Sequence, residues 1–472
     1  MTLPADTDIA TLHPTLQRLR RAWTEQRPPL AQRRADLKRL RVALADRLEL
    51  MAAATADDFG HRAKAESLLA DGMAVLAAID HLLAHLKAWS RPRAVGTGWR
   101  LWPARAQLRP VPLGVVGVMS PWNYPVNLAL VPLATAIAAG NHVFLKPSEH
   151  TPRTAAFLAE LLASVFPPER VAVAGGGPEV AAAFAGLAFD HLVFTGSTAV
   201  GRKVMAAAAA HLTPLTLELG GKSPAIVCDD APLAQVAARL ATGKWFNAGQ
   251  TCIAPDYVLV GAARREALVA ALREQVQARY GDLSDTQDYS SILDEDRYQR
   301  LLAWLEEARG AGAQVIELTR VDPAKARARR LIAPTVVLDA GDGLSLMREE
   351  IFGPVLPIVG CAGLDEAIAY VQARPRPLAL YPFGRDRAQL ERILGRLVAG
   401  GVTVNDTLLH FAAEGLPFGG IGASGMGAYH GQAGFDAMSK LMPVLWQPRW
   451  AASDLLRPPY ARLGRLLEFL VR

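Results

Sequence analysis

Short apolar runs alternate with longer stretches of helical periodicity over most of the chain after residue 112. The pattern predicts strands and helices in turn at 114–119, 126–140, 142–148, 151–166, 171–176, 178–186, 191–197 and 198–212. Strands separated by helices indicate β-α-β crossovers and a parallel sheet. Ligands of such sheets bind beyond the carboxyl ends of the strands.

A second alternating set runs from about 223 to 407. It has helical periodicity at 267–280 and 301–312 and a strand-like run at 401–406. The predicted fold class is therefore α/β, with two Rossmann-like domains, each built on an open parallel sheet, that face each other across a cleft.

The first 90 residues follow helical periodicity instead. Apolar residues recur at steps of three and four opposite a basic face, at Leu37, Leu40, Leu44, Leu48 and Met51. After a turn-rich link at 91–98, alternation at 99–108 predicts an exposed strand. The most membrane-like run, 126–145, contains Pro132, Gly140 and Asn141, and we interpret it as a buried helix that leads into a strand.

The composition is typical of a large globular enzyme. The chain has 472 residues, 51% of them hydrophobic and 20% charged, which predicts two or three domains. The net charge of +6 is concentrated in the first hundred residues, where a solvated helix face explains it, and no zinc-finger or RNA-binding motif occurs. We expect no nucleic-acid partner. Residues 1–14 lack the apolar core of a signal peptide, so we expect a soluble, cytoplasmic protein.

The three cysteines, Cys228, Cys252 and Cys361, cannot all pair and have no C-x-x-C or Cys/His ligand spacing. This pattern indicates a reducing compartment and no metal site. A buried free cysteine usually behaves as a small apolar residue. Cys252 is therefore interpreted as a nucleophile only if other groups of the reaction, such as an oxyanion donor and a base, accompany it.

Two loops that follow strands could supply such groups. SPWNYP places Asn123 where its amide can stabilise an oxyanion or simply satisfy the turn. FTGSTAVGR joins a strand to a helix at Gly196, which admits a phosphate or nicotinamide, or forms a tight turn that Ser197 or Thr198 caps. No G-x-G-x-x-G fingerprint follows a strand, so this loop alone is weak evidence for a dinucleotide.

Two further segments carry a carboxylate and the cysteine itself. Glu218 in LELGGKSP lies between leucines at a strand end, either as a paired structural group or as a base whose pKa burial raises. Cys252 in GQTCIAPDY has no neighbouring histidine, which disfavours a papain-type protease. Together the residue types suit one reaction: a thiolate adds to an aldehyde, an amide stabilises the oxyanion, hydride leaves to a nicotinamide, and a carboxylate activates water.

Eight motifs then identify a family resemblance. They are SPWNYP, VFLKPSE, VFTGSTAVGR, LELGGKSP, GQTCIAPDY, EEIFGPVLP, GVTVNDTLLH and LPFGGIGASGMGAYHGQAGFD. In this order they resemble the aldehyde dehydrogenase superfamily from about residue 10 to 450, most of all its class 3 branch and the bacterial coniferyl-aldehyde dehydrogenases. The resemblance implies that Cys252 is the nucleophile, Glu218 the general base and Asn123 an oxyanion donor beside the Cys252 backbone amide.

The resemblance also implies a cofactor site. Its residues are Trp122, Gly196, Ser197 and Gly201 along the cleft, Lys146, Ser148 and Glu149 at the adenosine ribose, and Glu350 and Phe352 at the nicotinamide. The Glu149 carboxylate would repel a ribose 2′-phosphate, which favours NAD, with NADP as the alternative cofactor.

The domains implied by the resemblance are a cofactor domain (1–96 and 110–221), a catalytic domain (222–437), a β oligomerisation flap (97–109 and 438–449) and a tail (450–472). They imply a homodimer. We expect the tail to pack on protein rather than on a membrane. The family's usual pattern changes at Met438-Ser439-Lys440 and at Pro382, and we expect these changes to affect the substrate entrance or the dimer contact.

The expected substrate is an aromatic aldehyde such as coniferaldehyde, or a medium-chain aldehyde, and the product is the carboxylic acid. Long-chain aliphatic aldehydes are the alternative. A CoA-acylating enzyme is disfavoured because Glu218 is present to activate water. A catalytically silent binding protein of the same fold is disfavoured because Cys252 is retained.

Overall fold

The computed structural model describes residues 6–449 together with 451, 458 and 464. The N-terminal segment is helical, as predicted, and forms α1 (Ile9–Glu25), α2 (Leu30–Ala45), α3 (Leu48–Phe59), α4 (Lys64–Ser67), a π-helix (Leu68–Met73) and α5 (Ala74–Trp89). The apolar stripe of the basic helix is divided between two helices, because Leu37, Leu40 and Leu44 belong to α2 and Met51 to α3. All four are buried. The prediction for the tail falls outside the described residues.

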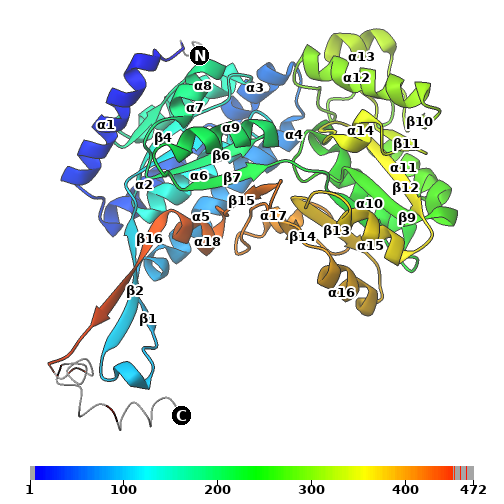
Figure 1. The fold of residues 1–472 in the computed structure, drawn as a ribbon. Coiled ribbons are helices and arrows are strands. Elements are labelled where there is room, and N and C mark those ends of the chain that lie inside the picture. Colours follow the sequence, from blue (N-terminus) through cyan, green and yellow to red (C-terminus); the bar gives the residue numbers. More distant parts are fainter. Residues whose placement is uncertain (1–5, 450, 452–457, 459–463, 465–472) are drawn as a thin grey trace.

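The first sheet has the strand order β15-β7-β6-β3-β4-β5 (Figure 1). Its strands are β3 (Val115–Met119), β4 (His142–Lys146), β5 (Val171–Val173), β6 (His191–Gly196), β7 (Leu215–Leu219) and β15 (Gly425–Met426). All are parallel except β15 at the edge. Its helices are α6 (Asn127–Ala139), α7 (Pro152–Val165), α8 (Pro178–Ala185) and α9 (Thr198–Ala209). Because α6 is buried throughout and ends at the left-handed Gly140, the interpretation of 126–145 is confirmed.

The second sheet has the order β10-β11-β12-β9-β8-β13-β14, with β10 as its antiparallel edge. Its strands are β8 (Pro224–Val227), β9 (Tyr257–Gly261), β10 (Gln314–Glu317), β11 (Thr335–Leu338), β12 (Val355–Cys361), β13 (Ala379–Phe383) and β14 (Gly401–Val402). Its helices are α10 (Leu233–Trp245), α11 (Arg265–Tyr280), α12 (Glu295–Gly310), α13 (Pro323–Arg329), α14 (Ser345–Arg348), α15 (Leu364–Gln372) and α16 (Arg387–Arg396). One continuous hydrophobic core joins the two sheets.

The chain returns to the first domain before the predicted boundary at 437. Gly425 of β15 pairs with Glu218 of β7, and α18 (Gly431–Ala437) packs on α5 and α6. The physical reason is that β15 covers a sheet edge that would otherwise expose unpaired backbone groups. Residues 425–437 therefore pack with the first sheet, and the division of the chain into domains stays a prediction.

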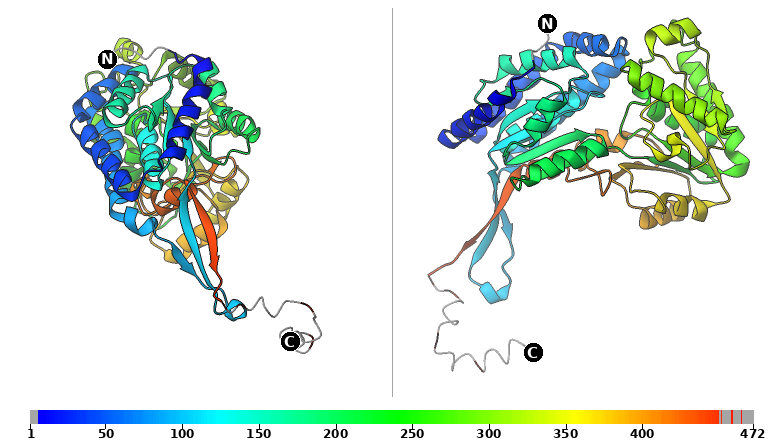
Figure 2. Two further views of the ribbon diagram at one scale, coloured as in Figure 1. Left: turned by 90° about the vertical axis from the view of Figure 1, so that its left-hand side faces the viewer. Right: turned by 45° about the horizontal axis from the view of Figure 1, so that its top comes forward.

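A third sheet extends from the body as an arm (Figures 1 and 2). It contains β1 (Arg93–Val95), β2 (Arg105–Pro112) and β16 (Ser439–Trp446), all antiparallel. β1 begins before the first predicted flap segment, 97–109, and β2 ends after it. β16 lies within the second predicted segment, 438–449. Within the first segment, Trp99–Leu101 is a short 3₁₀ helix rather than a strand.

One helical stretch of the described chain, Lys64–Trp89, is long and apolar enough by length and composition to cross a membrane. In the folded protein its Val75, Ile79, Leu82 and Leu86 side chains lie in the core. Length and composition alone therefore carry little weight for this helix, since a core helix passes the same test.

Candidate active site

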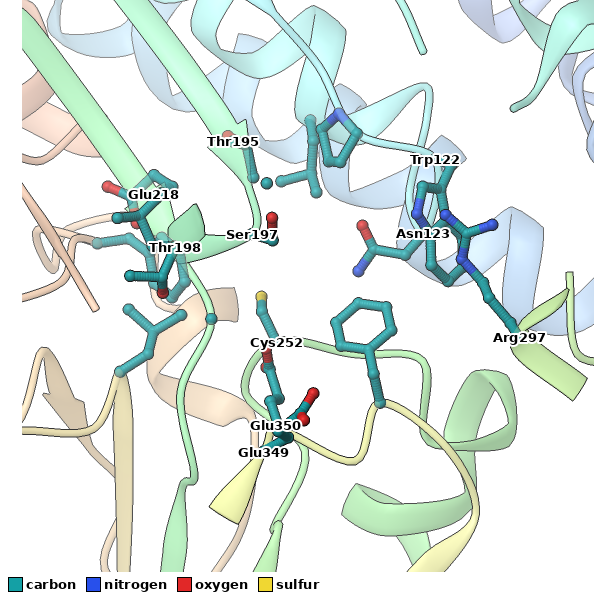
Figure 3. A pocket seen from close by; sticks show the side chains of 18 of the residues that line it. Trp122, Asn123, Thr195, Ser197, Thr198, Glu218, Cys252, Arg297, Glu349 and Glu350 are labelled. Atoms are coloured by element: carbon teal, nitrogen blue, oxygen red, sulfur yellow. The ribbon is translucent and has the colours of Figure 1, made fainter. Parts of the chain in front are cut away.

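A cavity of about 390 Å³ lies at the carboxyl ends of β3, β6 and β7 (Figure 3). It brings together the three residues predicted to perform chemistry, Asn123, Glu218 and Cys252, although they lie far apart in the sequence. Figure 3 shows the Cys252 sulfur near the middle of this space, with Asn123 on one side and Glu218 on the other. The location agrees with the rule for ligands of parallel sheets.

The turn before Cys252 has an unusual backbone. Asn247, Ala248 and Gly249 all have positive φ, at 52°, 49° and 75°. The Glu66 carboxylate accepts a hydrogen bond from the Asn247 amide at 3.0 Å, and a Cβ at Gly249 would overlap the carbonyl of Gly353. Strain of this kind persists only where surrounding contacts hold it. The turn therefore fixes the direction in which the cysteine leaves the loop.

Buried polar contacts complete the support of this loop. Gln250 Nε2 donates to Asn247 O at 3.1 Å and to Ser291 O at 3.0 Å, and Gln250 Oε1 accepts from the Leu293 amide at 2.9 Å. Thr251 Oγ1 lies 2.5 Å from Tyr124 Oη. Because every amide atom of Gln250 is satisfied, this side chain acts as a brace between the loop and its surroundings.

Asn123 points its amide toward the same loop. Asn123 Nδ2 donates to the Gln250 carbonyl at 3.1 Å, and Asn247 Nδ2 donates to the Asn123 carbonyl at 3.1 Å. One amide hydrogen of Asn123 is thus used to orient the group, and the other is available for a ligand oxygen. A fixed donor of this kind suits a developing oxyanion.

Burial favours the neutral form of both the Cys252 thiol and the Glu218 carboxyl. It raises the pKa of the Cys252 thiol to about 12, and the Glu350 and Glu218 carboxyls add to the effect. Burial also raises the pKa of Glu218 well above its ordinary range, and neither of its carboxyl oxygens has a hydrogen-bond partner in the described chain. Since the thiolate is the nucleophilic form, the thiol must pass its proton to a base before it reacts.

A lysine-centred contact joins three of the motifs. Lys222 Nζ forms an ion pair with Asp256 and donates to Leu346 O at 2.8 Å and Glu349 O at 2.9 Å. Asp256 Oδ1 accepts from the Ile351 amide at 3.0 Å. These contacts therefore fix three segments relative to one another, namely LELGGKSP, GQTCIAPDY and EEIFGP. Glu350 is thereby placed at the edge of the cavity.

Five of the predicted cofactor residues line this cavity, namely Trp122, Gly196, Ser197, Glu350 and Phe352. The Trp122 and Phe352 rings meet edge to face at 5.2 Å. Arg297 lies over Trp122 at 4.5 Å from the ring centroid, and together with Arg300 it adds positive charge that sequence reasoning missed. Neither arginine lies in a recognisable motif, so only the fold brings α12 to this position.

The other four predicted residues lie elsewhere. Lys146 is the last residue of β4, and Ser148 and Glu149 follow that strand. Gly201 lies in α9, where a Cβ would approach Leu219 Cδ2 to 2.5 Å. Gly201 therefore serves the close packing of α9 on β7, and none of the four lines the cavity around Cys252. Lys146 Nζ and Glu149 Oε2 are 3.2 Å apart.

A second cavity of about 480 Å³ reaches Cys252 from the other side of the loop. Its walls are mostly apolar and come from the π-helix, α5, α6 and the segment 408–414. Ala70, Ala74 and Ala78 have small side chains and therefore leave space along one wall of the cavity. The sequence pattern assigned these residues only to a helix. The departures from the family pattern do not line either cavity, namely Met438, Ser439, Lys440 and Pro382. Their expected effect on the substrate entrance or the dimer contact stays a prediction.

Comparisons with known proteins connect this geometry to one family. The model described as "Aldehyde dehydrogenase family" matches residues 15–444. The chain belongs to the aldehyde dehydrogenase family. The predicted fold and the class 3 resemblance are thereby confirmed.

Individual relatives agree with this membership. A probable coniferyl aldehyde dehydrogenase of Pseudomonas aeruginosa is 47% identical over 98% of this chain and 96% of its own length. Aldehyde dehydrogenase family 3 member A2 of Macaca fascicularis is 40% identical over 94% and 90%. The substrate-bound structure of Staphylococcus aureus AldH has a TM-score of 0.92 at 35% identity, with 97% and 99% coverage.

The family depends on NAD or NADP, and solved relatives include NAD complexes. The residues of the first cavity fit such a group. Glu350 Oε1 is buried with no hydrogen-bond partner in the described chain, burial raises the pKa of Glu350 to about 8, and a Cβ at Gly220 would overlap its other oxygen. A ribose hydroxyl would satisfy the unpartnered oxygen.

Proposed function

We propose that this aldehyde dehydrogenase oxidises an aromatic aldehyde such as coniferaldehyde to its carboxylic acid, with NAD as the preferred cofactor. The observation that carries the proposal is the position of Cys252 between two cavities. One is lined by the Glu350 carboxylate, two arginines and an amide and suits the nicotinamide end of a dinucleotide, and the other is apolar and suits the body of the aldehyde. The relatives named for coniferyl aldehyde support the aromatic substrate.

In the proposed mechanism, the Cys252 thiol loses its proton to solvent water and its sulfur then adds to the aldehyde carbon. Asn123 Nδ2 and the Cys252 backbone amide donate to the oxyanion of the resulting thiohemiacetal. NAD held by Glu350 and Phe352 would supply the hydride acceptor, and loss of hydride from this carbon would leave a thioester on Cys252. The ionised Glu218 carboxylate then takes a proton from a water molecule that attacks the thioester, the Cys252 sulfur leaves and takes up a proton, and the acid and the free thiol are released.

NAD is favoured over NADP because of Glu149. Burial alone would raise its pKa, but its own backbone amide and the Lys146 ammonium more than offset this, and the pKa is lowered. The ionised carboxylate can accept from a ribose 2′-hydroxyl and repels a 2′-phosphate. The adenosine ribose would lie on Lys146, Ser148 and Glu149 in this arrangement.

We further propose a cytoplasmic homodimer that uses the arm. Trp102 is 76% exposed, Leu445 52% and Trp446 57%, so the arm presents apolar side chains that a second copy would cover. A long-chain aliphatic aldehyde is the second candidate substrate, because Leu69, Met73 and Leu409 at the apolar cavity are each more than half exposed.

The test is NADH absorbance with purified protein and a panel of coniferaldehyde, benzaldehyde, hexanal and a long-chain aldehyde, with NAD or NADP. We expect the highest kcat/KM with coniferaldehyde and NAD. Hexanal or the long-chain aldehyde as the best substrate would favour the aliphatic candidate. A lack of NADH and NADPH with every aldehyde would refute the proposed activity.

A further inference from the structure

The apolar cavity contains one carboxylate, Glu414, among otherwise apolar or neutral lining residues. Glu414 follows α17 (Leu409–Ala412), and the turn that carries it is closed by a hydrogen bond from the Leu416 amide to Ala413 O at 2.8 Å. A Cβ at Gly431 would approach Glu414 O to 2.7 Å, so the segment packs closely against the start of α18. These backbone contacts thus hold Glu414 in the wall of the apolar cavity.

The Glu414 side chain has neither a hydrogen bond nor an ion pair in the part of the chain that the structure describes. Three buried carboxylates outside the two cavities do have a cation: Asp36 contacts Arg170, Asp71 contacts Arg62 and Asp256 contacts Lys222. Half-burial without a compensating cation raises the pKa of Glu414 to about 7. A carboxylate placed in this way lacks a donor.

The neighbouring side chains do not supply that donor. His430 lines the same cavity, but it is fully buried among Phe411, Phe418 and Tyr429, and burial lowers its pKa to about 3. It is therefore neutral and leaves the charge of Glu414 uncompensated. The cavity extends from this carboxylate to Cys252, where the aldehyde group must be.

We propose that Glu414 accepts a hydrogen bond from a hydroxyl group of the substrate at the end opposite the aldehyde. This makes Glu414 a specificity-determining residue that selects phenolic aldehydes over their methyl ethers. The inference rests on the proposed function, because it concerns the substrate of the same site. A substrate hydroxyl would donate a hydrogen bond to the Glu414 carboxylate, whereas a methyl ether would cover the carboxylate without offering a donor.

The experiment compares kcat/KM for coniferaldehyde and for its 4-O-methyl ether, in which a methyl group replaces the hydroxyl hydrogen. A hydrogen bond to a charged group predicts that the wild-type protein prefers coniferaldehyde by about 10- to 100-fold. Glu414→Leu should bring this ratio close to one, mainly through KM. Glu414→Gln, which keeps the shape and an acceptor oxygen, should retain part of the preference. Glu274→Gln, at an exposed carboxylate of α11, is the matched control and should keep the wild-type ratio.

The outcomes separate the two proposals. A wild-type protein that oxidises both aldehydes with equal kcat/KM would overturn the role of Glu414 and leave the proposed function standing. A ratio in Glu414→Leu equal to that of the wild type would do the same. A wild-type protein that forms no NADH from either aldehyde would refute the proposed function itself. Melting temperatures of the variants within a few degrees of wild type show that each one is folded.

Discussion

The buried ion pair of Arg62 and Asp71 gives the sharpest test of how the active-site loops are supported. Both side chains are fully buried, and Arg62 Nη2 lies 3.1 Å from Asp71 Oδ2. The guanidinium also lies 5.0 Å from the ring centroid of Tyr124. Asp71 Oδ1 accepts from the Val126 amide at 3.1 Å and the Asn127 amide at 2.9 Å, at the start of α6. The pair therefore anchors the chain directly after Asn123.

Arg62→Met should destabilise the protein by about 3 kcal/mol. Removal of one partner of a buried pair costs about 3–5 kcal/mol, since the other charge is left without compensation. We expect the low end because the two backbone amides still contact Asp71. The double variant Arg62→Met/Asp71→Asn should recover most of this loss, since Asn keeps an acceptor for both amides and carries no charge.

The assay is urea unfolding at pH 7, followed by tryptophan fluorescence and circular dichroism, as a double-mutant cycle. Burial raises the pKa of Asp71, and loss of Arg62 should raise it further. The penalty of Arg62→Met is then largest above that pKa and shrinks as the pH falls through it, because a neutral acid needs no cation. A single variant as stable as the wild type, or a double variant less stable than the single one, would refute this reasoning.

Three further predictions concern the cavity around Cys252. Glu218→Gln should keep a burst of about one NADH per site but lower steady-state turnover by about 10²–10⁴-fold, the usual contribution of a general base; unchanged steady-state turnover in stopped-flow traces would contradict the assignment. Alkylation of Cys252 by iodoacetamide in the cofactor-free protein should accelerate about tenfold per pH unit from pH 7 to 9, because its pKa is about 12; a plateau in this range, measured by peptide mass spectrometry, would argue against a neutral thiol. Gly220→Ala should raise the KM for NAD by about tenfold or more while circular dichroism stays unchanged, because the added Cβ overlaps Glu350; an unchanged KM would show that Glu350 has another role.

The alternation of strands and helices was sufficient to predict which loops meet around one cavity. Asn123, Gly196 and Glu218 each follow or end a strand whose apolar run is evident in the sequence, and parallel strands bring such loops to one edge. Cys252 could be placed beside them only through the family resemblance, because its left-handed turn has no periodic signal.

Other features depend on contacts between distant segments, which a local pattern does not encode. The return of β15 to the first sheet rests on two residues, Gly425 and Met426, too few for a strand pattern. The apolar cavity is lined by alanines that any buried helix would contain. Arg297 and Arg300 precede the helical periodicity predicted at 301–312 and reach the cavity only through the packing of α12.

The most direct test of the account is the covalent intermediate on Cys252. Glu218→Gln is mixed with NAD and coniferaldehyde, quenched in acid after the NADH burst, digested and analysed by mass spectrometry. The account predicts one acyl adduct, on the peptide that contains Cys252. A full NADH burst with no adduct, or with the adduct on Cys228 or Cys361, would contradict it.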